Sequence, residues 1–142
     1  MENRLKEIIL IRHGEAQHHL NGMNGGWTDS FLSPRGHAQA RRTAQALPRL
    51  LNGNTFSFYT SDLQRASQTA EPIAEATGIQ IVPTPGLREF NNGQADGMTR
   101  EQAKAIGIPI SHPTEDWIPY PGAESWRLME KRVSACMDQI AR

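Results

Sequence analysis

The stretch IILIRHGE, residues 8–15, decides the fold of this 142-residue chain. Its first four residues form a short, continuous apolar run that is mostly β-branched. A run of this kind is typical of a strand covered on both faces, as strands are in a parallel sheet. Because the run passes directly into charged and polar residues, we expect reactive side chains at the carboxyl end of a buried strand.

Helical and strand patterns alternate along the rest of the chain. Ser33 is a preferred N-cap and Pro34 suits the first helical position, and apolar residues then recur at helical spacing. Gly78 stands where a C-terminal helix cap belongs, and Pro72 is expected to kink or shorten the helix before it. Residues 16–31 and 83–98 are predicted to be loops. The predicted strands are residues 8–11, 56–59 and 79–82, and the predicted helices are residues 33–51, 63–77, 99–106 and 124–142.

This alternation predicts an α/β fold, a three-layer αβα sandwich with a mostly parallel sheet, in a single domain of residues 1–142. The last helix carries an apolar stripe that includes Trp126, but it has no stop signal before Arg142. A helix that crosses such a sheet normally delivers another strand, and three strands make a small sheet. We therefore expect the fold to be incomplete at its C-terminal side.

Composition narrows the classes of function. Fifteen Lys and Arg balance fifteen Asp and Glu, and this neutrality argues against a nucleic acid or a membrane surface as partner. The single cysteine, Cys136, excludes an intramolecular disulfide framework and a Cys-rich zinc site. The sequence shows neither a signal-like segment nor an apolar run long enough for a membrane helix, so we expect a cytoplasmic protein.

Polar residues follow each predicted strand. Arg12 and His13 come after the first, Ser61 and Arg65 after the second, and Glu89 after the third. Ligands of open α/β sheets bind beyond the carboxyl ends of the strands. We therefore expect two arginines, a histidine and a carboxylate to meet in one cleft.

This set of residues suits phosphate chemistry. The guanidinium groups of Arg12 and Arg65 can each hold phosphate oxygens, and the neutral imidazole of His13 can attack phosphorus. Gly14 would let the backbone approach the phosphate closely. The carboxyl group of Glu89 can protonate the leaving oxygen and then activate water. The scheme requires no metal and no cofactor.

Each residue by itself also has a structural interpretation. A lone histidine after a strand is more often structural than catalytic. Arg12 can be a buried ion-pair partner, Arg65 an exposed helix residue and Glu89 a surface carboxylate. The neighbouring His18 and His19 are more typical of a solvated loop than of a metal site.

Five segments in order carry a family resemblance over nearly the whole chain. They are LIRHGE at 10–15, DSFLSPRGHAQA at 29–40, TSDLQRASQTA at 60–70, LRE at 87–89 with the glycines after it, and PGAES at 121–125. Together they resemble the histidine phosphatase superfamily, the phosphoglycerate mutase-like proteins. The resemblance implies a phosphoglycerate mutase-like fold, with His13 as the phosphorylated nucleophile, Arg12 and Arg65 as phosphate clamps, and Glu89 as the proton donor.

The sequence also departs from the family pattern. The family's pocket usually has a second histidine, in a strand after the last helix, and no such segment occurs here. Ala16 replaces a Ser or Thr, and His19 stands where the family often has Asn. Asn21, which can substitute for that Asn, is a candidate substrate-binding residue together with Thr28 and Ser61.

The region after Glu89 helps to distinguish a phosphatase from a mutase within this family. The glycolytic mutases carry a longer insertion there and usually place Arg directly after the acid, where this chain has Phe90. We therefore expect hydrolysis of a small phosphorylated substrate, a phosphomonoester, through a phosphohistidine. The alternatives are mutase-type phosphoryl transfer and a non-catalytic phosphate-binding homologue. A second copy of the chain could supply the missing strand by exchange between protomers, which would make a homodimer.

Overall fold

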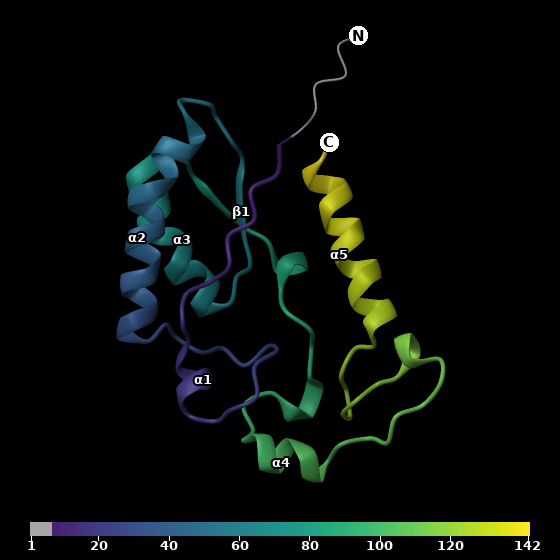
Figure 1. Ribbon diagram of the computed structural model, residues 1–142. Helices are drawn as coiled ribbons and strands as arrows, with labels where there is room; N and C mark the ends of the chain where they lie inside the picture. The colour runs from purple at the N-terminus through teal and green to yellow at the C-terminus, as the bar shows by residue number, and fades with distance from the viewer. Residues whose placement is uncertain (1–6) are drawn as a thin grey trace.

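The computed structural model describes residues 7–142 (Figure 1). In chain order its main elements are α1 (Gln17–Leu20), α2 (Pro34–Leu51), β1 (Phe58–Thr60), α3 (Gln64–Thr77), β2 (Ile81–Pro83), α4 (Arg100–Ala105) and α5 (Trp126–Ile140). Short 3₁₀ turns are η1 (Pro85–Leu87), η2 (Gly93–Ala95) and η3 (Thr114–Asp116). β1 and β2 pair in parallel, with Phe58 opposite Ile81. The predicted α/β class and parallel sheet are confirmed.

The three helices α2, α3 and α5 flank the sheet on its two sides (Figure 1). Figure 1 shows α2 and α3 together on one side of β1 and α5 on the other. The buried core lies on the α2 and α3 side, where Ala44, Leu47 and Leu51 of α2 meet Ile73 of α3. Burying each of the larger side chains contributes roughly 1.5–3 kcal/mol. Partly buried residues pack against this cluster: Ile9, Ile11, Phe56, Phe58 and Ile79.

Local signals set the ends of α2 and α3. The Oγ of Ser33 accepts a hydrogen bond from the Gly36 amide at 3.0 Å, which caps the start of α2. α3 ends at Gly78, whose φ of 71° is the left-handed conformation that favours glycine. Pro72 lies inside α3, yet the helix continues to Thr77, so the expectation that it shortens the helix is wrong.

The strand predicted at Ile8–Ile11 is absent from the described residues. This segment is extended, but its backbone forms no hydrogen bond with any residue of 7–142. A strand needs a neighbour for its N–H and C=O groups, and here β1 pairs with β2 alone. Ile8 and Leu10 are also 64% and 86% exposed, so the expectation that this run is covered on both faces is wrong.

Two further expectations need correction. The predicted loop of residues 16–31 contains α1, whose His19 side chain accepts a hydrogen bond from the Ala16 amide at 3.2 Å and so closes the first turn. Trp126 was assigned to the apolar stripe of the last helix but is 58% exposed. It occupies the first position of α5, where its ring lies against Phe90 with centroids 5.1 Å apart.

Candidate active site

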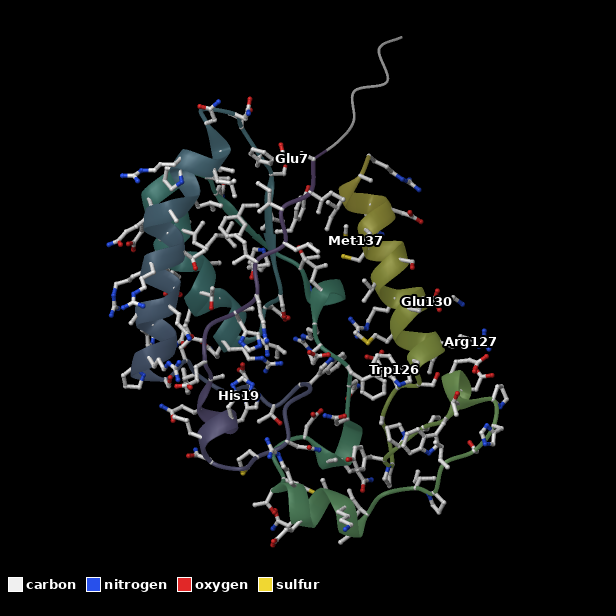
Figure 2. All side chains as sticks on the ribbon, in the orientation of Figure 1. Glu7, His19, Trp126, Arg127, Glu130 and Met137 are labelled. Atoms are coloured by element: carbon white, nitrogen blue, oxygen red, sulfur yellow. The ribbon has the colours of Figure 1, made fainter. Side chains whose placement is uncertain are left out.

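A cavity of about 1050 Å³ brings the predicted site residues together. Arg12, His13, Arg65 and Glu89 all line it, as the sequence predicted. Its apolar lining comes from both faces of the fold. The apolar residues that line the cavity include Ile9, Ile11, Leu47, Leu51, Phe58 and Ile73, together with Met129, Val133, Met137 and Ile140 from α5. Figure 2 shows Met137 pointing from α5 toward the sheet, while Arg127 and Glu130 lie on the outer side of the helix.

His13 has the geometry of a nucleophile. Its Nδ1 lies 2.7 Å from the carbonyl oxygen of Gly14. Because a carbonyl oxygen only accepts, Nδ1 must carry the proton, and the Nε2 of the neutral ring therefore keeps a free lone pair. Burial lowers the pKa of His13 and the charge of Arg65 lowers it further, against the hydrogen bond to Gly14 that raises it. The ring is thus neutral near pH 7, which is the form that can attack phosphorus.

Arg65 is a buried cation held in place by backbone. It is 3% exposed, and its two terminal nitrogens donate to the carbonyls of Thr28 at 2.9 Å and Gly26 at 2.7 Å. Burial lowers its pKa, while the charges of Glu89, Asp29 and Asp96 act in the opposite direction. Since a guanidinium keeps its proton in proteins, Arg65 places a fixed positive charge at the cavity wall.

Arg12 differs from Arg65 because its side chain is exposed. Its guanidinium forms no hydrogen bond or ion pair with any other residue in the described part of the chain. Its charge acts on His13, and both residues also line a second cavity of about 420 Å³. The geometry leaves its guanidinium free to bind an anion next to His13.

Gly14 has a packing role in this structure. Its buried amide donates to the Oγ1 of Thr69 at 3.0 Å. A Cβ at position 14 would lie 2.5 Å from the Gly36 carbonyl oxygen, and one at position 36 would lie 2.0 Å from the Glu15 carbonyl oxygen. The two glycines therefore let the loop and α2 touch, and Gly14 lines the second cavity with Arg12 and His13. Its close approach to phosphate stays a prediction.

Glu89 lies on a segment tied down by its neighbours. Its side chain is exposed, and its Oε1 accepts from the Phe90 amide at 2.8 Å. The Nε and a terminal nitrogen of Arg88 donate to the two carboxylate oxygens of Asp62, which lowers the pKa of Asp62. The Nε1 of Trp27 donates to the Glu89 carbonyl at 2.7 Å. The backbone of Glu89 is thus fixed, and this residue lines the cavity.

The structure does not gather the other predicted substrate-binding residues in the same way. Ser61 lines the cavity, and its Oγ accepts from the Leu63 amide at 3.3 Å. Thr28 contributes its carbonyl to Arg65, and its Oγ1 accepts from the Gly97 amide at 2.7 Å. Asn21 ends α1, and neither Asn21 nor Thr28 lines the cavity. Their contact with substrate stays a prediction.

Two side chains that the sequence did not place at the site lie close to the predicted set. His18 is buried, and its Nδ1 finds no hydrogen-bond partner in the described part of the chain. Its ring lies 4.1 Å from that of His19, which in turn lies 5.9 Å from the ring of His13. Arg132 of α5 contacts the segment that carries Glu89, residues 86–91, which we call the acid segment. Sequence reasoning missed both residues because nothing in the neighbouring sequence indicates that a histidine in a polar loop, or a single arginine on an amphipathic helix, lies near the site.

Comparison with known proteins shows the family of this chain. The sequence profile of the histidine phosphatase superfamily (branch 1) matches residues 8–142. The chain belongs to this superfamily.

Relatives in the histidine phosphatase superfamily include both mutases and phosphatases. A 2,3-bisphosphoglycerate-dependent phosphoglycerate mutase of Bartonella tribocorum is 33% identical over 103 residues, which cover 70% of this chain and 49% of that protein. A mycobacterial glucosyl-3-phosphoglycerate phosphatase, solved with VO3, aligns with a TM-score of 0.76 at 27% identity. That alignment covers 91% of this chain and 64% of the phosphatase. The chain therefore spans about half to two thirds of the length of these proteins.

The remaining sequence predictions concern surroundings rather than the site. Among residues 7–142, no group of three or more His, Cys, Asp and Glu is arranged to hold a metal ion. No helix in the described part of the chain is long and apolar enough to cross a membrane. A cytoplasmic location and a metal-independent reaction stay predictions.

Proposed function

We propose that the chain hydrolyses small phosphomonoesters through a covalent phosphohistidine on His13. The observation that carries this proposal is the bond from His13 Nδ1 to the Gly14 carbonyl, which leaves Nε2 as a free nucleophile. Membership of the histidine phosphatase superfamily supports it. So does the gathering of Arg12, Arg65 and Glu89 around one cavity.

In the first step the Nε2 lone pair of His13 attacks phosphorus and the ester P–O bond breaks. The leaving oxygen takes a proton from the carboxyl group of Glu89, so that a neutral alcohol departs. Arg12 and Arg65 neutralise charge on the phosphoryl oxygens, because phosphoryl transfer depends on positioning and electrostatics more than on covalent chemistry.

In the second step water attacks the phosphohistidine. The Glu89 carboxylate accepts a proton from that water, the P–N bond breaks, and inorganic phosphate leaves. His13 returns to the neutral form with Nδ1 still donating to Gly14. Every bond that forms is balanced by one that breaks, and no metal or cofactor enters the cycle.

The direct test is turnover of p-nitrophenyl phosphate in the presence of EDTA. We expect the wild-type chain to turn over this substrate and His13→Ala to abolish the turnover. His37 lies on α2 outside both cavities, so the control variant His37→Ala should keep the wild-type rate. A phosphohistidine trapped by quenching in alkaline denaturant, where its P–N bond is stable, and detected by ³¹P NMR would identify the intermediate. Full activity of His13→Ala, or loss of activity with the chelator, would contradict the mechanism.

Mutase activity is the second candidate, because relatives named as phosphoglycerate mutases are among the proteins that the chain matches. A coupled assay that follows conversion of 3-phosphoglycerate to 2-phosphoglycerate separates the two functions. Hydrolysis that exceeds isomerisation supports the phosphatase, and the reverse supports the mutase. Phosphate binding without either reaction would favour the non-catalytic alternative. The homodimer stays a prediction that sedimentation of the chain would test.

A further inference from the structure

The guanidinium group of Arg132 donates hydrogen bonds to several backbone carbonyls of the segment that carries Glu89. One terminal nitrogen donates to the carbonyls of Gly86 and Arg88, each at 2.9 Å. The other donates to the carbonyl of Glu89 at 3.1 Å. A single side chain from α5 therefore binds carbonyl oxygens along this segment, more than 40 positions earlier in the chain.

Glu124 holds Arg132 in this position. Arg132 donates to both of its carboxylate oxygens, at 2.5 Å and 3.2 Å, and both side chains are largely buried. Glu124 also reaches the acid segment itself. Its Oε1 accepts from the Asn91 amide at 2.9 Å, and its own amide donates to the Asn91 carbonyl at 3.0 Å. The segment is thus bound at Gly86, Arg88, Glu89 and Asn91 by one ion pair.

Trp27, in the loop between α1 and α2, contacts the same segment. Its ring lies beneath the guanidinium groups of Arg88, at 4.7 Å, and Arg132, at 5.9 Å. Its Nε1 shares the Glu89 carbonyl with Arg132. These bonds fix the backbone of Glu89 but leave its carboxyl group, within residues 7–142, hydrogen-bonded only to the Phe90 amide. The contacts of Arg132 and Trp27 therefore hold the Glu89 backbone in place without using its carboxyl group.

We infer that Arg132, held by Glu124, is the positioning residue that sets where the carboxyl group of Glu89 lies relative to His13. The inference rests on the proposed function, because it assumes that Glu89 is the proton donor. A general acid must lie within about 2.6–3.2 Å of the atom that it protonates, and misplacing a reacting group by about 1 Å can cost about 10²-fold in rate. Lysine cannot replace Arg132, because one ammonium group lacks the planar fork that reaches several acceptors.

The test compares two esters that differ in their need for an acid. p-Nitrophenolate leaves without a proton, whereas the alkoxide of ethyl phosphate requires one. We measure kcat/KM, which reports only the steps up to departure of the alcohol, for wild type, Arg132→Met, Arg132→Lys, Glu124→Gln and Glu89→Gln. For Arg132→Met we expect a loss of about 10²-fold with ethyl phosphate and less than about 5-fold with p-nitrophenyl phosphate. Arg132→Lys should resemble Arg132→Met, and Glu124→Gln should lose less.

Arg127→Met is the matched control. Arg127 lies on the same helix, is exposed, and binds Asp116 and Glu115 rather than the acid segment. It should keep wild-type rates with both esters. Equal losses with the two esters in Arg132→Met would show a merely structural role and overturn the inference, and so would wild-type rates with both.

Failure of the proposed function gives a different pattern. If Glu89→Gln treats the two esters alike, Glu89 is not the acid, whatever Arg132→Met does. If the wild-type chain turns over neither ester, the amide resonances of residues 86–91 report the geometry directly. Arg132→Met should then shift these resonances while Arg127→Met leaves them in place, and unchanged resonances in Arg132→Met would overturn the inference.

Discussion

His18 should make the stability of the chain fall as the pH is lowered from 7.5 to 5.0. Its side chain is 7% exposed, and its Nδ1 has no partner among residues 7–142. Burial lowers its pKa from 6.5 to about 4, and the charges of His19, Arg65, His13 and Arg100 add to the shift. The folded protein therefore keeps this ring neutral at a pH where the unfolded chain protonates it.

The sign and size of the effect follow from proton linkage. In the unfolded chain His18 becomes protonated below pH 6.5, whereas in the folded chain it stays neutral until the pH nears 4. Because the unfolded state binds this proton more tightly, lowering the pH favours unfolding. With these two pKa values, the free energy of unfolding drops by about 2 kcal/mol between pH 7.5 and 5.0. Above pH 7.5 the contribution is constant.

The assay is urea unfolding followed by tryptophan fluorescence at both pH values, for wild type and His18→Met. Methionine is neutral and flexible enough to fill the space of the ring. Carboxylates and other histidines titrate in both proteins, so the difference between their pH effects isolates His18. We expect wild type to lose about 2 kcal/mol more than His18→Met. Equal losses, or an NMR titration that places the pKa of His18 near 6.5, would refute the reasoning.

Four further predictions concern stability. Gly36→Ala should lower the free energy of unfolding by about 1–3 kcal/mol, because the added Cβ would meet the Glu15 carbonyl oxygen at 2.0 Å; thermal unfolding measures the loss. Ser33→Ala should cost about 1 kcal/mol through the lost cap of α2, and unchanged urea midpoints would contradict it. Leu10→Gln should change stability by less than about 0.5 kcal/mol because this side chain is 86% exposed. Ile73→Ala, at 1% exposure, should cost about 2–5 kcal/mol in the same assay.

Local sequence was enough for the longer helices and for the family. The cap at Ser33 and the glycine at position 78 mark helix ends that the structure confirms. These signals act within a few residues of one another, so they can be read without knowing the rest of the fold. The same holds for the short motifs that contain His13 and Arg65, which predicted that both residues line one cavity.

Only the tertiary structure could show the roles of residues that act over long distances in the chain. The extended run Ile8–Ile11 looks like a buried strand in sequence, but a strand exists only where a neighbour pairs with its backbone. Gly14 is required by contact with Gly36, and Arg132 meets Gly86 46 positions away. No local pattern encodes such contacts. The sequence by itself determined the long helices, the family and the candidate site residues, whereas packing between distant segments decided which polar groups are buried, which glycines are essential and what holds the backbone of Glu89 in place.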